Sequence, residues 1–205
     1  MFDSEALKTA IMRGKRNDVV TIVQGAIDAK VDLNAILDQG MIPAMREIGD
    51  KFSRNEAYVP ELLIAARAMQ FGLALIEPLI AASGRESKGK IAIGTVCGDL
   101  HDIGKNLVAI MLKGAGYDVI DLGVNCDVAK YEEGVRQGAT IVACSSLLTT
   151  TMGYMKEVVE HFKGTDVKVI VGGAPVTQEF ADEIGAAGYS DDANAAVKLV
   201  DSLLA

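Results

Sequence analysis

One stretch decides the fold of the second half of the chain: IAIGTVCGDLHDIGKN, residues 91–106. Its first six residues are apolar or small, as in a buried strand, and a helix-like apolar run follows at residues 107–112. The polar residues between them therefore lie in a loop at the carboxyl end of a strand, where α/β sheets gather their ligands. His101 is a good metal ligand, and Asp99 can accept a hydrogen bond from its second ring nitrogen.

From residue 90 onward, strand-like and helix-like segments alternate. Continuous apolar strands with helical crossovers predict a parallel sheet that is covered on both faces. We expect a flavodoxin-like (Rossmann-like) doubly wound sheet of five strands, with the order 2-1-3-4-5 taken by analogy. The expected strands are 91–96, 119–122, 141–144, 167–171 and 188–190, and the expected helices are 103–115, 128–137, 152–162, 178–184 and 193–203.

The first part of the chain, residues 1–84, shows only helical periodicity and predicts a small helical bundle. Asn17 or Asp18 is expected to cap its second helix, and Pro43 is expected to kink or divide its third. The polar, Gly-containing residues 85–89 predict a linker to an α/β domain at 90–205.

Composition narrows the classes of function. The net charge is −8 and no basic cluster offers a nucleic-acid face, so we expect no nucleic-acid partner. The longest apolar run, 62–80, is interrupted by Arg67, Gln70 and Glu77, and the N-terminus is polar, so we expect neither a membrane span nor a signal peptide. The three cysteines form no C-x-x-C pair, which is typical of reduced thiols and favours a cytoplasmic protein.

Three segments follow the first, third and fourth predicted strands of the sheet: 99–104, 145–151 and 172–175. These strands are neighbours in the expected order, so the segments converge on one concave site. The site combines one imidazole with several hydroxyls and Gly-rich walls that let a ligand approach the backbone.

This combination resembles the cobalamin-binding domain of the methionine synthase type. The family pattern is D-x-H-x-x-G, then S-x-L, then G-G; the matching residues are Asp99, His101, Gly104, Ser145, Leu147, Gly172 and Gly173. Residues 45–52 and 58–62 look like the helical cap of that family, so the resemblance covers nearly the whole chain. We expect no substrate-binding or folate-binding barrel, and the architecture is similar to the free-standing corrinoid proteins of methyltransferase systems.

The resemblance implies roles for three reactive residues. His101 would ligate cobalt from below, in the base-off/His-on mode. Asp99 would hydrogen-bond the other imidazole nitrogen and tune its donor strength. Thr151 would be the third member of this relay; the family has serine there, and threonine keeps the hydroxyl. The Asp–His pair could couple cobalt ligation to proton uptake.

The resemblance also implies how the rest of the cofactor is held. The displaced nucleotide tail and the corrin would be contacted by Asp102, Ile103, Gly104, Ser145, Leu147, Thr149, Gly172 and Gly173. Asp102 also suits the cap of the following helix. The upper cobalt face would be covered by four cap residues: Phe52, Tyr58, Val59 and Leu62. The family often has Phe and Leu at positions 58 and 59, so this cap carries an added hydroxyl.

The function implied is a corrinoid methyl carrier. Its cofactor would be cobalamin, as methylcobalamin or cob(I)alamin, or a related corrinoid. Its partners would be a substrate:corrinoid methyltransferase, a second corrinoid:tetrahydrofolate or corrinoid:thiol methyltransferase, and a reductive activase. Alone it would turn over little, and the linker would act as a hinge that moves the cap aside.

Three alternatives belong to other classes. A cobalamin-dependent sensor or photoreceptor needs an output module, usually DNA-binding, and this chain is acidic. A mutase small subunit shares D-x-H-x-x-G but generally lacks the helical cap. A receiver or flavodoxin domain is disfavoured, because a receiver needs a phosphorylated Asp after strand 3 and this strand ends in Cys144-Ser145.

Overall fold

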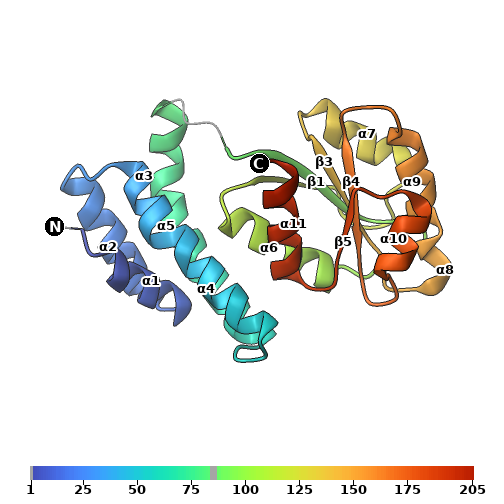
Figure 1. Cartoon of the computed structure of the whole chain (residues 1–205). Coiled ribbons are helices and arrows are strands. Elements are labelled where there is room, and N and C mark those ends of the chain that lie inside the picture. Colours follow the sequence, from blue (N-terminus) through green and yellow to red (C-terminus); the bar gives the residue numbers. More distant parts are fainter. Residues whose placement is uncertain (1, 84–86) are drawn as a thin grey trace. The chain divides into compact units, whose positions relative to one another are not determined.

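The structure, a computed structural model, describes residues 2–83 and 87–205. It separates into two compact units, each described here by itself (Figure 1). The first contains the N-terminal helices together with Gly114–Gly116, and the second contains Ser87–Lys113 and Tyr117–Ala205. Part of the predicted linker, residues 85 and 86, lies outside the described residues, so the boundary 85–89 stays a prediction.

The first unit is helical, as expected. Its helices are α1 (Ser4–Met12), α2 (Arg16–Asp28), α3 (Leu33–Ile36), the π-helix η1 (Leu37–Met41), α4 (Ile42–Ser53) and α5 (Val59–Ser83). Asp3 caps α1 and Asp32 caps α3, because each carboxylate accepts a backbone N–H of the first turn. The expected cap of α2 is wrong: Lys15 holds that position without a side-chain hydrogen bond, and the helix already includes Asn17 and Asp18.

The predicted third helix is not divided at Pro43: helical structure runs without a break through α3, η1 and α4, and the residues at their junctions have right-handed helical angles. Within η1 the helix widens by one residue per turn, and the N–H of Ile42 donates to the carbonyl of Leu37, five residues earlier. Pro43 follows directly; it has no N–H for an intrahelical bond and suits the first turn of α4. The missing N–H of the proline therefore falls directly after the π-helical stretch, inside a helical backbone that continues to Ser53.

Among the described residues, one segment has the length and apolar composition of a membrane span: Val59–Leu79 of α5. The helix contacts α1, α2 and α4. Its buried side chains recur at helical spacing: Leu62, Ala65, Ala66, Ala68, Met69 and Ile76. We interpret α5 as the core helix of the bundle, and the absence of a membrane partner stays a prediction.

The second unit is a five-stranded parallel sheet in the order β2-β1-β3-β4-β5, which confirms the predicted fold and strand order. Its strands are β1 (Lys90–Thr95), β2 (Asp118–Asp121), β3 (Ile141–Ser145), β4 (Lys168–Gly172) and β5 (Gly188–Ser190). The central strands β1, β3 and β4 are buried along nearly their whole length, which explains their continuous apolar sequences.

Helices cover both faces of this sheet (Figure 1). They are α6 (Ile103–Gly114), α7 (Val128–Arg136), α8 (Thr149–Met152), α9 (Tyr154–Phe162), α10 (Gln178–Ile184) and α11 (Ala193–Leu203). Helices α7, α9 and α10 lie on one face, with α6 and α11 on the other. The expected helix 152–162 is α9; the short α8 before it was missed, and it carries Thr151.

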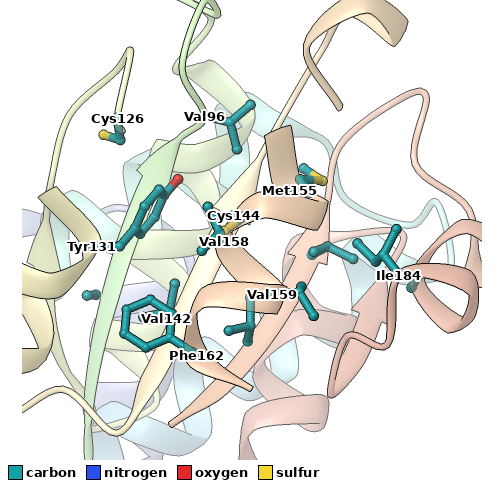
Figure 2. Close-up of a cluster of buried hydrophobic side chains, with 14 of the residues drawn as sticks. Val96, Cys126, Tyr131, Val142, Cys144, Met155, Val158, Val159, Phe162 and Ile184 are labelled. Carbon is teal, nitrogen blue, oxygen red and sulfur yellow. The ribbon is translucent and has the colours of Figure 1, made fainter. Parts of the chain in front are cut away.

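The core under α7 and α9 reaches the carboxyl ends of the strands (Figure 2). Tyr131 is fully buried there, and its hydroxyl donates to the carbonyl of Gly94 at 3.0 Å. Burial raises the pKa of the Cys144 thiol to about 12, so this cysteine is an inert packing group. The floor beneath the strand ends is therefore close-packed and neutral.

Candidate functional site

The carboxyl ends of three strands lie level with one another. The sheet register pairs Thr95 of β1 with Ser145 of β3, and Ser145 with Gly172 of β4. The three segments predicted to converge therefore start from one line across the sheet. The loop after β1 turns through Gly98, whose φ of +82° is readily adopted by glycine.

His101 is fixed at this edge by hydrogen bonds to its backbone and its ring. Its N–H donates to Asp99 Oδ1 at 3.0 Å, and its carbonyl accepts from the Thr95 hydroxyl at 2.8 Å. The ring nitrogen Nδ1 lies 2.7 Å from the same Asp99 oxygen, and half of the His101 side chain is exposed. The pairing predicted from the D-x-H spacing is thus present, with Nε2 left for another partner.

The other oxygen of Asp99, Oδ2, is equally surrounded by donors. It accepts from the backbone N–H groups of Leu147 at 2.8 Å and Leu148 at 3.3 Å, and from the Thr151 hydroxyl at 3.0 Å. The Asp99 side chain is completely buried. Segments after β1 and β3 are therefore joined through one carboxylate.

The electrostatics follow from these contacts. Burial by itself raises the pKa of the Asp99 carboxyl, but hydrogen bonds from the N–H groups of His101 and Leu147, the His101 ring and the Thr151 hydroxyl outweigh it. The pKa of Asp99 is held well below its ordinary value. The residue is a carboxylate at neutral pH, which places the shared proton on Nδ1 of His101.

Sequence reasoning missed Ser146, the neighbour of the predicted Ser145. Its buried hydroxyl lies 2.8 Å from the Thr151 hydroxyl and 3.3 Å from Asp99 Oδ2. The carbonyl of Leu148 also lies within hydrogen-bonding distance of both hydroxyls, at 3.1 Å from Ser146 and 3.0 Å from Thr151, as an alternative acceptor for their protons. Two serines in a row at a strand end were the available signal, because successive residues point to opposite sides of a strand and only one can face the carboxylate.

The other predicted polar residues lie at the same edge. Ser145 is half-buried at the end of β3, and Thr149 is exposed at the start of α8. Asp102 is exposed, and its carboxylate accepts from the side-chain amide of Asn106 at 3.0 Å. Gly104 lies in the first turn of α6 with open space where a Cβ would stand.

Large apolar side chains surround His101 and are exposed. Leu100 and Ile103, on either side of it in sequence, are 71% and 80% exposed. Leu147 and Leu148, whose N–H groups bind Asp99, are 45% and 41% exposed. We call these four side chains the apolar rim. An exposed apolar cluster around a polar centre is typical of a ligand-binding surface.

The paired glycines after β4 have different reasons to be glycine. At Gly173 φ is +130°, and a Cβ would stand 1.9 Å from the Ser146 carbonyl oxygen. At Gly172 a Cβ would stand 3.0 Å from the Ser190 carbonyl oxygen. The β4 loop therefore packs directly on the backbone after β3, and the wall between these strands is made of main chain.

The four predicted cap residues lie at the turn between α4 and α5 of the helical unit. Tyr58 is 66% exposed, whereas Leu62 is fully buried. Phe52 and Val59 are half-buried. Their role over a ligand stays a prediction.

Comparison with known families identifies the chain. A B12 binding domain family matches residues 89–198, more than half of the chain, and a second B12 binding domain family matches residues 4–77. The chain belongs to the B12-binding corrinoid proteins. The second match covers the helical unit, so both units carry the family's sequence pattern.

Relatives of this corrinoid protein match along nearly its whole length. A corrinoid protein of Desulfitobacterium hafniense (strain Y51) is 42% identical over 98% of this chain and 96% of its own length. The trimethylamine corrinoid protein of Methanosarcina barkeri is 40% identical over 89% of this chain and 88% of its own.

Similar solved structures agree with this family assignment. The methanol:cobalamin methyltransferase complex MtaBC from Methanosarcina barkeri matches with a TM-score of 0.85 and 28% identity, covering 97% of this chain and 78% of that chain. A cobalamin-binding protein from Desulfitobacterium hafniense DCB-2 matches with a TM-score of 0.81 and 28% identity, covering 99% of both chains.

The residues of this corrinoid protein fit the group that the family binds. A neutral imidazole with its proton held at Nδ1 offers Nε2 as a metal ligand. The apolar rim suits the hydrocarbon periphery of a macrocycle, and Gly104 leaves open space where a side chain would stand. Corrinoid binding therefore agrees with the donor atom, the surface chemistry and the backbone of the site.

Proposed function

We propose that the chain is a methyl carrier that binds cobalamin base-off/His-on. It shuttles a methyl group between a substrate:corrinoid methyltransferase and a second methyltransferase with a tetrahydrofolate or thiol acceptor. The observation that carries the proposal is the His101 ring, held by the buried carboxylate of Asp99 with half of its surface open among the apolar rim. The relatives named as corrinoid proteins of methylamines, and the MtaBC complex, support it.

When bound, the corrinoid supplies a cobalt ion that accepts and releases a methyl group. The chain's own residues prepare the lower side of that ion. Asp99 keeps the proton of His101 on Nδ1, so that Nε2 presents its lone pair. Thr151 and Ser146 hold the carboxylate in place. The hydrogen bonds to Asp99 hold the pKa of its carboxyl well below the ordinary value, so the partner of the imidazole is a carboxylate at neutral pH.

The remaining predicted residues would bind the nucleotide tail of the cofactor and shield its upper face. We assign the nucleotide tail to the slot beside Ser145, Thr149, Gly104 and the glycine pair 172–173. Phe52, Tyr58, Val59 and Leu62 shield the upper face, and the linker at 85–89 lets them move aside. The exposed phenol and ring of Tyr58 support this assignment, because an exposed aromatic side chain has surface to offer a ligand.

The proposal implies further partners and a location. A reductive activase restores the carrier when the cobalt is oxidised, and both methyltransferases dock in turn. Three thiols without a disulfide support a reducing cytoplasmic compartment.

The test is the spectrum of the cobalamin-loaded protein. In cob(II)alamin, an axial nitrogen splits each cobalt line of the electron paramagnetic resonance spectrum into a triplet. In wild-type protein labelled with 15N-histidine we expect a doublet in place of the triplet, which distinguishes His101 from the cofactor's own benzimidazole base. The doublet should be lost in His101→Ala and kept in the matched control His161→Ala, whose ring pairs with Glu132 on the α7–α9 surface. A His101→Ala spectrum identical to that of the wild type contradicts lower ligation.

Methyl transfer is tested with the cognate methyltransferases. A cross-link that fixes the helical unit to the sheet should stop transfer while cobalamin stays bound. Unimpaired transfer in the cross-linked protein contradicts the hinge.

A further inference from the structure

The loop between β2 and α7 contributes to the site, although sequence reasoning drew only on the loops after β1, β3 and β4. Its central residue is Asn125, which has a φ of +51°. Asparagine tolerates this left-handed conformation better than other residues with a side chain. The conformation brings the backbone N–H and the side-chain amide of Asn125 to the loop that carries Asp99.

Two hydrogen bonds join the loops. The N–H of Gly98 donates to Oδ1 of Asn125 at 2.8 Å. The N–H of Asn125 donates to the carbonyl of Asp99 at 3.0 Å. The donor and the acceptor lie at opposite ends of the Gly98-Asp99 dipeptide, so one residue grips the backbone of this dipeptide from both ends.

The anchor is itself fixed to the sheet. The N–H of Cys126 donates to the carbonyl of Thr95 at 2.9 Å, and Val96 and Cys126 form an isolated parallel bridge. The ammonium of Lys130 donates to the carbonyl of Val124 at 3.1 Å. A displacement of the Asp99 backbone relative to β1 therefore requires that Asn125 move or release it.

We propose that Asn125 is a positioning residue for the Asp99–His101 pair: it holds the Asp99 backbone so that the carboxylate presents His101 Nε2 at the angle required for ligation. The inference rests on the proposed ligation of cobalt by His101. Asn125 touches neither the metal nor the imidazole and acts only through the backbone of residues 98 and 99.

Two substitutions of Asn125 separate the effect of its left-handed backbone from the effect of its side-chain acceptor. Asn125→Gly keeps the left-handed backbone and removes the acceptor, whereas Asn125→Asp keeps an acceptor in a residue that tolerates the same φ. Lys30→Gly is the matched control, because Lys30 is also left-handed, with a φ of +55°, but follows α2 in the helical unit, away from the turn that carries the cap residues.

The first readout needs no cofactor. Amide exchange of Gly98, followed by NMR in the cobalamin-free protein, should be about three- to tenfold faster in Asn125→Gly, as expected for the loss of one hydrogen bond, and near wild type in Asn125→Asp. The second readout is the nitrogen-split fraction of the cob(II)alamin spectrum. In protein labelled with 15N-histidine, the fraction split by histidine nitrogen should fall in Asn125→Gly, return in Asn125→Asp and stay unchanged in Lys30→Gly.

The outcomes are distinguishable. Wild-type protein without nitrogen splitting overturns the proposed ligation itself, before any Asn125 variant is considered. Wild-type splitting that Asn125→Gly leaves unchanged overturns the positioning role alone. A loss of splitting in Asn125→Gly that Asn125→Asp does not restore also overturns it, because the acceptor is then not what matters.

Discussion

The polar centre of the site and its apolar rim are interleaved in sequence, yet they differ in burial. The polar centre is buried and hydrogen-bonded, whereas the rim is exposed. Asp99 is buried and accepts hydrogen bonds from protein groups at both oxygens. Leu100 and Ile103, beside it, are among the most exposed large apolar side chains of the described residues. The contrast teaches that the fold itself fixes the donor geometry but leaves the rim open, and we propose that the corrinoid buries it.

Leu147 and Leu148 belong to both regions. Their N–H groups bind the Asp99 carboxylate while their side chains remain partly exposed. Substitution of a side chain leaves the N–H in place, so the two regions can be changed separately. The following predictions use this separation, from the largest expected effect to the smallest.

Gly173 and Gly104 give the clearest separation between an effect on stability and an effect on cobalamin binding. Gly173→Ala forces a Cβ to within 1.9 Å of a backbone oxygen at a φ of +130°, and we expect a loss of at least about 3 kcal/mol in the free energy of unfolding. Gly104→Ala has open space and should not destabilise the cobalamin-free protein. We expect Gly104→Ala to lower only the affinity of the protein for cobalamin, because Gly104 is proposed to contact the corrinoid. Urea denaturation and cobalamin titration measure the two effects; equal stabilities for the two variants contradict the division.

Asp99→Asn tests whether the polar centre stabilises the ligand-free fold. The amide places N–H groups against buried donors, so unfolding should become easier by about 2–3 kcal/mol at pH 7. The folded pKa of Asp99 lies below its unfolded value, so the carboxylate contributes stability above about pH 4 and loses it as the pH falls further.

The deficit of Asp99→Asn should therefore shrink below pH 4. Asp102→Asn is the control, because that carboxylate is exposed and has the Asn106 side chain as its partner. A deficit that does not change between pH 7 and pH 3 argues against an ionised Asp99.

The rim should behave in the opposite way. Leu100→Ser with Ile103→Ser replaces two exposed side chains, so the stability of the cobalamin-free protein should change by less than about 0.5 kcal/mol. Affinity for cobalamin should fall about tenfold, because apolar area that the ligand covers is lost. Isothermal titration checks the affinity; unchanged binding removes the rim from the site.

Lys105 tests a polar contact behind the rim. Its ammonium is buried and pairs with Asp121 at the end of β2, whose side chain is partly exposed. Lys105→Met should cost about 1 kcal/mol, since water can solvate the carboxylate that remains. The matched control is Lys163→Met on the exposed Glu160 pair, where we expect no measurable change in a thermal melt. A larger loss in the control contradicts this ranking.

Much of this molecule could be predicted from the sequence, for identifiable reasons. The apolar strands and the turn residues after them determine the sheet, and the D-x-H spacing places Asp99 against the His101 ring. Ser146 and Asn125 could not be found in the same way. Their partners lie 47 and 27 residues away in the chain, and their roles depend on which way a strand end faces and on a left-handed backbone.

The predicted N-cap of α2 is wrong for a different reason. Asn17 and Asp18 are favoured N-caps, but the chain starts its helix earlier, at Arg16, because the turn at Gly14 bonds back to the end of α1. Local preference lost to the connection between two helices, which sequence propensity does not describe.

The π-helical stretch at Leu37–Met41 determines how α4 is rotated about its own axis. An extra residue in a helix turns everything after it by about 100° around the axis. The face on which α4 presents Met45, Ile48 and Phe52 is therefore set by five residues that precede it. Deleting one of the five should rotate those side chains together by that angle, so the aim of Phe52 is determined more than ten residues before it.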